Sequence, residues 1–242
     1  MRFGGLSALE DLNLAVPAGS LSGLIGPNGA GKTTVFNLIS GFLQPTGGHI
    51  FWDGRDVTGE PPHCLTTRGI ARTFQNIRLF GDLSVLDNVL VGFHCRSHAT
   101  WGEAVFRLPR YRREELDCRS RGLALLTAVG LAAAADHPAG QLPYGHQRRL
   151  EIARALATGP RCLLLDEPAA GLNPQETVEL MAFIRGLQGR YDLTILIIEH
   201  NLRLVMGLCQ HLTVLDHGLT IAAGTPGEVR KNPAVIRAYL GK

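Results

Sequence analysis

The chain has 242 residues, enough for one large domain or for a core domain with an inserted subdomain. Hydrophobic residues make up 45% and charged residues 19%, as in an ordinary globular protein, and the formal net charge of +3 is too small to argue for nucleic acid as a partner. The longest nearly apolar stretch, Leu123 to Ala135, is shorter than the roughly 20 residues that span a bilayer, so we expect no membrane crossing.

The first residues carry no signal-peptide pattern, and the five cysteines are scattered, which favours reduced thiols in a cytosolic protein. Further along, Leu12 to Val16 alternates apolar and polar residues with a period of two. Pro17 to Gly19 interrupts the alternation, and the apolar run Leu21 to Ile25 follows. The pattern predicts a hairpin that leads into a glycine-rich segment.

That glycine-rich segment has the spacing G-x-x-x-x-G-K-T of a phosphate-binding loop, between a predicted strand and a helix that begins near Thr33. Its glycines let successive backbone N–H groups turn toward a phosphate, and the following helix adds the positive end of its dipole. The residues that we expect to contact a nucleotide are Gly26, Pro27, Asn28, Gly29, Ala30, Gly31, Lys32, Thr33 and Thr34.

Two side chains of this loop have predicted roles of their own. The Lys32 ammonium can reach the β- and γ-phosphates of a triphosphate, and the Thr33 hydroxyl can bind Mg²⁺. The alternative is a glycine-rich turn with a chance lysine. It has little weight, because the fixed positions of the motif and the flanking strand and helix patterns all match a phosphate-binding loop.

The middle of the chain changes from strands to helices. Ile50 and Trp52 precede Asp53-Gly54, a dipeptide typical of hairpin turns. A strand near 69–74 ends at Gln75, and the regions 85–91 and 103–135 are predicted to be helical.

The second half alternates strands with helices, which predicts a parallel α/β sheet. After a loop over 138–145, the expected elements are a helix from near Gln147, a strand over 162–166, a helix over 174–187, a strand over 193–198, a helix over 202–209, a hairpin of 212–215 and 219–221, and a helical tail over 226–240.

An apolar strand that ends in Asp166 and Glu167 places two carboxylates at the edge of the sheet where phosphates bind. We expect Asp166 to hold Mg²⁺ and Glu167 to orient, or accept a proton from, the water that attacks the γ-phosphate. Alone, the pair could be an acidic helix cap, but the phosphate loop makes that reading weak.

Gln75 and His200 also follow predicted strands. The Gln75 amide could contact the metal or the water, although a single glutamine carries little information. His200 could bond the γ-phosphate and Glu167, whereas a lone histidine is more often structural.

Taken together, the phosphate loop, Gln75, the stretch 144–149, Asp166-Glu167 and His200 resemble the ATP-binding-cassette (ABC) ATPases over nearly the whole chain. The resemblance implies an α/β P-loop NTPase fold with a RecA-like parallel-sheet core, an antiparallel β subdomain and an inserted α-helical subdomain. It assigns residues 1–77 and 159–242 to the core and about 78–158 to the helical subdomain. It also implies ATP and Mg²⁺ as cofactors and a head-to-tail dimer.

A closer resemblance is to the ATPases of branched-chain amino acid importers of the LivG type. It is carried by the segments 2–5, 26–37, 72–76, 144–154, 167–174 and 232–241. The resemblance implies a second, different ATPase chain, two membrane permeases, a periplasmic amino-acid-binding protein as an indirect partner, and no nucleic acid. It implies a peripheral position on the cytoplasmic face of the bacterial inner membrane.

Two positions depart from the family pattern. Where the family's signature loop reads L-S-G-G-Q, this chain has Leu142-Pro-Tyr-Gly-His146, so the serine hydroxyl and one backbone donor are missing. Tyr144, Gly145 and His146 would contact the ATP of the partner chain, and we expect the two ATP sites to be unequal. Phe3 matches the aromatic residue that stacks on adenine, but only two residues precede it. Either the true start lies upstream or the family's first strand is absent, and in the second case we expect weak stacking.

Other functions stay open at this point. An ABC ATPase without a transporter usually has two cassettes in one chain or large insertions, and a P-loop kinase or GTPase would lack the signature loop and His200. Among transporters, the ATPases for urea or lipopolysaccharide are near alternatives.

Overall fold

The computed structural model describes residues 1–96, 101–106 and 108–240. Arg107 of the predicted helical region and Gly241 of the tail lie outside these ranges. The chain divides into two compact units, Met1–Leu65 with Arg161–Lys242, and Thr66–Pro160. The boundary falls inside helix α2 (Pro62–Thr67).

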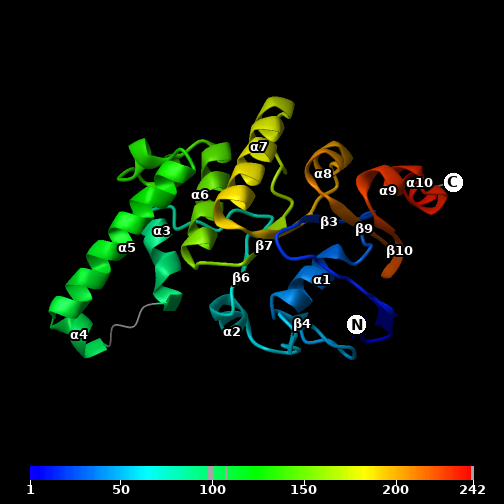
Figure 1. Cartoon of the computed structure of the whole chain (residues 1–242), viewed down its shortest axis with the longest axis horizontal. Coiled ribbons are helices and arrows are strands. Elements are labelled where there is room, and N and C mark those ends of the chain that lie inside the picture. Colours follow the sequence, from blue (N-terminus) through cyan, green and yellow to red (C-terminus); the bar gives the residue numbers. More distant parts are fainter. Residues whose placement is uncertain (97–100, 107, 241–242) are drawn as a thin grey trace. The chain divides into compact units, whose positions relative to one another are not determined.

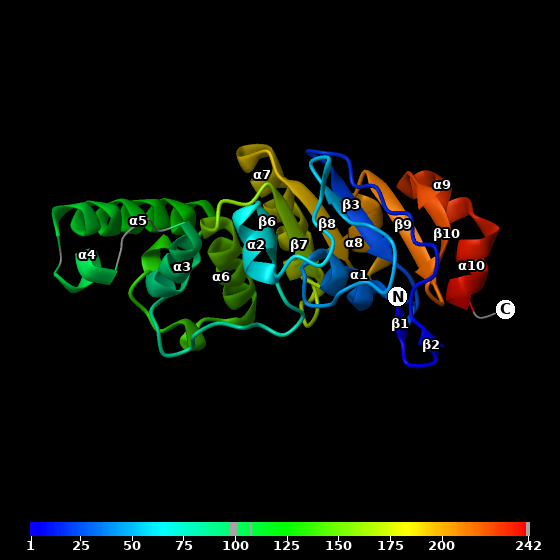
Figure 2. The same cartoon turned by 90° about the horizontal axis from the view of Figure 1, so that it is seen from below.

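The first unit is built on a sheet whose strands lie in the order β10-β9-β3-β8-β7 (Figures 1 and 2). Strands β3 (Leu21–Ile25), β7 (Cys162–Asp166) and β8 (Thr194–Ile198) are buried at every residue and run parallel, as expected for short apolar strands. Strand β9 (His211–Asp216) is parallel to β3, and β10 (Leu219–Gly224) closes an antiparallel hairpin. The predicted parallel α/β core is confirmed.

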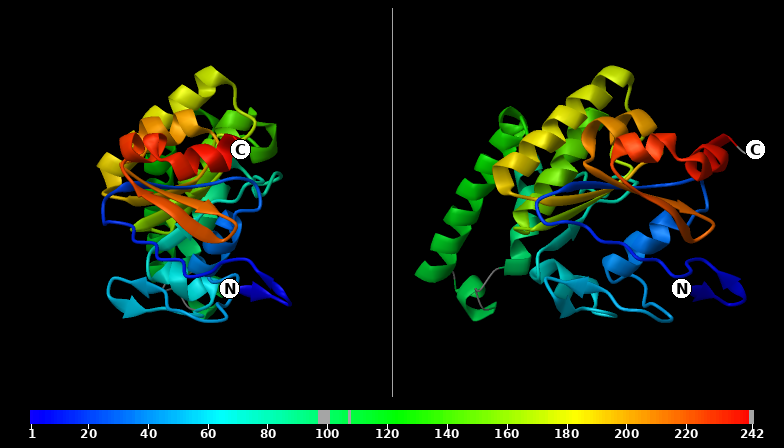
Figure 3. Two further views of the ribbon diagram at one scale, coloured as in Figure 1. Left: turned by 90° about the vertical axis from the view of Figure 1, so that its right-hand side faces the viewer. Right: turned by 45° about the vertical axis from the view of Figure 1, so that its right-hand side comes forward.

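Helices cover both faces of this sheet (Figure 3). Helix α1 (Lys32–Ile39) lies on one face, and α7 (Pro174–Tyr191), α8 (Leu202–Leu208), α9 (Pro226–Lys231) and α10 (Pro233–Leu240) lie on the other. Phe36 on α1 and Leu24 on β3 are completely buried. The N-terminus of α7 is closed by a capping box between Asn173 and Glu176.

The predicted hairpins at Asp53-Gly54 and His217-Gly218 are present. All four turn residues have positive φ, as the turns of tight hairpins require. The first turn joins β4 (Phe51–Trp52) to β5 (Arg55–Asp56), which pair antiparallel. The second joins β9 to β10.

The prediction of a strand over 12–16 is wrong. These residues alternate between exposed and half-buried, so the alternation did predict which side chains face the protein. A strand also needs a neighbour for its backbone hydrogen bonds, and among the described residues none pairs with this segment. The N-terminal hairpin is formed instead by β1 (Arg2–Phe3) and β2 (Leu6–Ser7), as Figure 2 shows.

The second unit is mostly helical. After strand β6 (Ile70–Arg72), helix α3 (Val85–Phe93) packs against both α5 (Pro109–Ala128) and α6 (Tyr144–Ala157), while α4 (Trp101–Val105) contacts α5. Short 3₁₀ turns occur at 94–96, 132–134 and 139–141. Leu86, Leu126 and Leu150 are completely or almost completely buried and form the centre of this unit. Its arginine-rich helix α5 carries exposed ion pairs such as Arg121–Asp117, as expected of a solvated face.

Two further boundaries differ from the predictions. Helix α6 begins at Tyr144, three residues before the predicted start, because Pro143 has the extended conformation of an N-cap residue and its carbonyl accepts the His146 and Gln147 amides. The predicted tail helix is broken between Lys231 and Pro233, since proline cannot continue the hydrogen-bond pattern of α9.

The predicted subdomain limits of 78 and 158 stay a prediction. None of the described helices combines the length and the apolar character needed to cross a bilayer.

Candidate active site

Three predicted site segments follow neighbouring parallel strands. The phosphate loop follows β3, Glu167 follows β7, and His200 lies two residues after β8. Ile198 on β8 is paired with Leu24 on one side and with Asp166 on the other. Since strands lie about 4.8 Å apart, the carboxyl ends of β3, β8 and β7 bring these segments to one edge of the sheet.

The phosphate loop has the left-handed backbone that its glycines predict. The φ angles of Gly26, Gly29 and Gly31 are 153°, 80° and 103°. A Cβ atom on Gly26 would lie 2.1 Å from the Leu215 carbonyl oxygen, whereas a Cβ on Gly29 would meet nothing within 4 Å. Gly26 is therefore required by packing as well as by conformation, and Gly29 by conformation alone.

The Lys32 side chain turns back over this loop. Its Nζ donates to the carbonyl oxygens of Gly26 at 2.7 Å and Pro27 at 2.8 Å, and the residue is almost buried. Burial lowers the pKa of the ammonium group, while the charge of Glu167 opposes this shift. The sheet edge thus combines a buried cation with a nearby carboxylate.

Asp166 ends β7 and is 5% exposed. Glu167, the next residue, has a φ of 45°, and its backbone N–H donates to the Ile198 carbonyl at 2.9 Å. This unusual backbone turns the chain out of the strand. Glu167 Oε2 lies 3.6 Å from His200 Nδ1, close enough for an ion pair if the imidazole is protonated but too long for a hydrogen bond.

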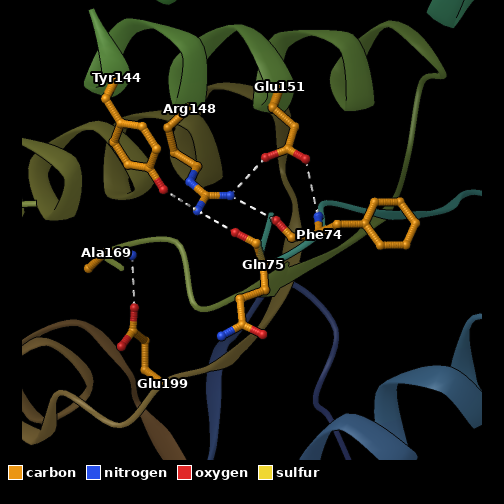
Figure 4. Close-up of polar contacts among 7 residues, drawn as sticks. All are labelled: Phe74, Gln75, Tyr144, Arg148, Glu151, Ala169 and Glu199. Carbon is orange, nitrogen blue, oxygen red and sulfur yellow. Dashed lines mark hydrogen bonds and ion pairs between the residues drawn. The ribbon is translucent and has the colours of Figure 1, made fainter. Parts of the chain in front are cut away.

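Glu199 is a buried carboxyl group that the sequence analysis did not single out. It is 1% exposed, and its Oε1 accepts the Ala169 N–H at 2.9 Å (Figure 4). Its Oε2 accepts the Asn201 N–H at 3.3 Å. Burial raises the pKa of this carboxyl group, and the two backbone bonds oppose the shift. Glu199 therefore joins the turn after Glu167 to the segment that carries His200. The sequence signal that could have identified Glu199 is its position next to His200, directly after an apolar strand.

The oxygen atoms of the side chains at this edge suit an Mg²⁺ ion that takes most of its ligands from a nucleotide and from water. Thr33 on the first turn of α1 and Asp166 offer hard oxygen atoms. No group of three or more His, Cys, Asp or Glu side chains able to hold a metal occurs among the described residues. Mg²⁺ commonly takes only one or two protein ligands and completes its shell with phosphates and water, so these residues fit it.

The other predicted residues lie elsewhere in the chain. Phe3 is 45% exposed on the N-terminal hairpin. Gln75, Tyr144, Gly145 and His146 belong to the second unit, where Gln75 is exposed beyond β6 and the other three form the first turn of α6.

Within that unit a buried ion pair holds the Gln75 segment. Arg148 and Glu151 on α6 are 1% and 2% exposed, and their Nη1 and Oε2 atoms are 3.0 Å apart (Figure 4). Burial raises the pKa of the Glu151 carboxyl, which the charge of Arg148 opposes. The sequence analysis missed this pair because arginine and glutamate are mostly exposed, and the Phe74 and Gln75 backbone that they bond lies more than 70 residues away.

Comparison with known proteins adds family information. The sequence model of the family described as "ABC transporter" matches residues 9–170. A second model, described as "Branched-chain amino acid ATP-binding cassette transporter", matches residues 220–242.

This chain aligns with several known proteins over nearly their whole length. The chain is 48% identical to the high-affinity branched-chain amino acid transport ATP-binding protein BraF of Pseudomonas aeruginosa, and 46% identical to LivG, with the same description, of Escherichia coli. Each alignment covers 100% of this chain and 95% of the relative. The crystal structure of the ADP conformation of MJ1267, an ATP-binding cassette of an ABC transporter, has a TM-score of 0.86 and 32% identity, and the match covers 100% of this chain and 96% of that one.

Proposed function

Because this chain belongs to the ATP-binding proteins of ABC transporters and is an ATPase, we propose that it powers the import of the branched-chain amino acids leucine, isoleucine and valine. The substrate class is supported by the two named relatives and by the family match at the C-terminal end of the chain. The observation that carries the catalytic part is the shared edge of β3, β8 and β7, where the phosphate loop, Glu167 and His200 meet.

The phosphate loop provides binding. Backbone N–H groups of the loop from Gly26 to Thr34, apart from Pro27, which has none, surround the phosphates together with the N-terminus of α1, and Lys32 contacts the β- and γ-phosphates as a point charge. Thr33 and Asp166 hold Mg²⁺, which neutralises charge on the phosphates when it is bound.

The hydrolytic step uses the residues at the ends of β7 and β8. Glu167 orients the attacking water and accepts its proton, and His200, whose Nδ1 lies 3.6 Å from Glu167 Oε2, donates a hydrogen bond to the γ-phosphate. For Gln75, the family resemblance implies a role as a ligand of the metal or the water. These roles rest on residue type and on the family resemblance.

The remaining contacts are adenine stacking and contacts across a dimer. Phe3 stacks on adenine, and Tyr144, Gly145 and His146 contact the ATP held by the partner chain. Pro143 offers no backbone N–H in front of α6. The ATP site that this loop completes is therefore the weaker one, and the site built on Lys32 and Glu167 turns over faster.

The chain acts as one of two ATPases bound to two permeases on the cytoplasmic face of the bacterial inner membrane, with a periplasmic binding protein delivering the amino acid. Transport rather than another ABC function follows from the similarity of the whole chain to transport proteins.

Uptake of labelled leucine by cells tests the proposal. A strain whose only copy carries Glu167→Gln should lose leucine uptake, while Glu115→Gln, the same change on the exposed face of α5, should leave it unchanged. Labelled urea serves as the substrate control.

Unchanged leucine uptake with the Glu167→Gln chain present in normal amount would remove the amino acid assignment. Loss of urea uptake instead would support the alternative transporter class. Equal losses from Glu167→Gln and from the same change in the partner ATPase would contradict the proposed inequality of the two sites.

A further inference from the structure

The ion pair of Arg148 and Glu151 is almost completely shielded from water. Both side chains are at most 2% exposed. Removing two charges from water is costly, and an apolar pair of similar volume often stabilises a protein as well or better. A buried pair is therefore better explained by what it holds in place.

What the pair holds is the backbone of Phe74 and Gln75. Arg148 Nη1 donates to the Phe74 carbonyl and Nη2 to the Gln75 carbonyl, both at 2.8 Å, while Glu151 Oε1 accepts the Phe74 N–H at 3.2 Å. Three backbone groups of two consecutive residues are thus fixed to α6 (Figure 4). Such a bidentate fork defines both position and orientation.

The same guanidinium also contacts the first turn of α6. Arg148 Nη2, which donates to the Gln75 carbonyl, lies 3.2 Å from the Tyr144 hydroxyl oxygen and donates to it as well. Tyr144 and Arg148 are four residues apart, so their side chains lie on the same face of the helix. One nitrogen atom therefore bridges Tyr144 and Gln75.

We propose that Tyr144 is a positioning residue for Gln75, acting through Arg148. This inference rests on the proposed function, in which Gln75 serves the metal and the first turn of α6 contacts the ATP of the partner chain. A displacement of that turn changes the Tyr144–Arg148 bond and hence the Gln75 backbone. The usual signature loop has a glycine at this position, which offers no side chain for such a link.

Tyr144→Phe isolates the hydroxyl group. Phenylalanine keeps the ring over which the Arg148 guanidinium lies at 5.8 Å, and the residue is 44% exposed, so the variant should fold. Tyr111→Phe makes the same one-atom change on α5 of the same unit and serves as the control.

The first readout is amide exchange in the full-length chain without nucleotide or Mg²⁺. Exchange of the Phe74 amide should become about two- to tenfold faster in Tyr144→Phe than in Tyr111→Phe, the range that loss of one hydrogen bond produces. Equal exchange in the two variants would overturn the proposal.

The second readout is the Mg²⁺ concentration that gives half-maximal ATP hydrolysis by the membrane complex purified through a tag on this chain. It should rise about two- to tenfold in Tyr144→Phe and stay unchanged in Tyr111→Phe. A fall in hydrolysis at every Mg²⁺ concentration without a change in this midpoint would indicate a merely structural role and contradict the proposal.

Three further variants keep the test decisive. Arg148→Lys retains the charge but cannot bond both carbonyls, so it should shift both readouts at least as far as Tyr144→Phe, while Arg113→Lys on the exposed face of α5 should shift neither. Lys32→Ala separates the two proposals. If it hydrolyses ATP normally, the proposed function fails, while the exchange measurement still decides whether Tyr144 positions Gln75.

Discussion

Two regions of the molecule hold charged side chains in different ways. One is the edge of the first unit where β3, β8 and β7 end, called here the catalytic edge, and the other is the Arg148–Glu151 pair of the second unit. At the edge, Glu167 and His200 are 3.6 Å apart, beyond hydrogen-bond distance, and His200 is largely exposed. In the second unit, Arg148 and Glu151 bond their partners at 2.8 to 3.2 Å and are shielded from water. At the catalytic edge Lys32 and Asp166 are buried but His200 stays accessible, whereas both charges that hold the Gln75 segment are enclosed.

Arg148→Met removes the buried Arg148–Glu151 ion pair and should have the largest effect on stability. The free energy of unfolding should fall by about 3–5 kcal/mol, because Glu151 is left as an unpaired buried charge. Urea unfolding, compared with Arg113→Met on α5, measures this loss. The double variant with Glu151→Gln should recover part of it, and a loss no larger than that of Arg113→Met would show that the pair is not structurally important.

Two glycines of the catalytic edge, Gly26 and Gly29, both have a positive φ, and the loss of stability on substitution by alanine can be compared between them. Gly29→Ala should cost about 1–2 kcal/mol, the strain of a left-handed alanine, because its Cβ has room. Gly26→Ala adds a clash with the Leu215 carbonyl and should cost about 1–2 kcal/mol more. Thermal unfolding measures both, and equal losses would mean that the loop moves freely away from β9.

Glu199→Gln tests the buried group that braces the catalytic edge. A glutamine amide can accept only one of the two backbone N–H groups, so we expect a loss of stability of about 1–2 kcal/mol near pH 5. The control is Glu115→Gln on α5, which should be neutral.

The effect of Glu199→Gln should depend on pH. Burial raises the pKa of Glu199 above the ordinary value of 4.5, so the folded chain binds more protons than the unfolded chain between these two pKa values. The unfolding free energy of the parent therefore falls as the pH rises through this window, and the variant lacks this fall. The difference between them should shrink from pH 5 to pH 8, and a difference that grows would contradict a raised pKa.

The sequence predicted the catalytic edge better than the enclosed pair. A phosphate loop and an Asp-Glu pair after an apolar strand are local patterns, since each follows directly from its own strand, and β3 and β7 appear where these patterns place them. The link between Arg148 and Gln75 spans 73 residues, and nothing near either residue in the sequence indicates it.

The missed boundaries have similar causes. Residues 12–16 keep the alternation of a strand, but pairing depends on a neighbour that local pattern does not supply. Tyr144 and Gly145 suggested a loop because glycine disfavours helices, whereas Pro143 fixes the helix start before them.

The central claim is that Lys32 serves binding and Glu167 serves hydrolysis, and counting bound and hydrolysed ATP in one sample tests it most directly. The purified membrane complex would be incubated with radiolabelled ATP and Mg²⁺, and the nucleotide retained on the protein would be separated into ATP and ADP. We predict that Glu167→Gln retains ATP and hydrolyses it about 10²- to 10⁴-fold more slowly, whereas Lys32→Ala loses retained ATP from this chain. Hydrolysis by Glu167→Gln at the rate of the unaltered complex would contradict the account.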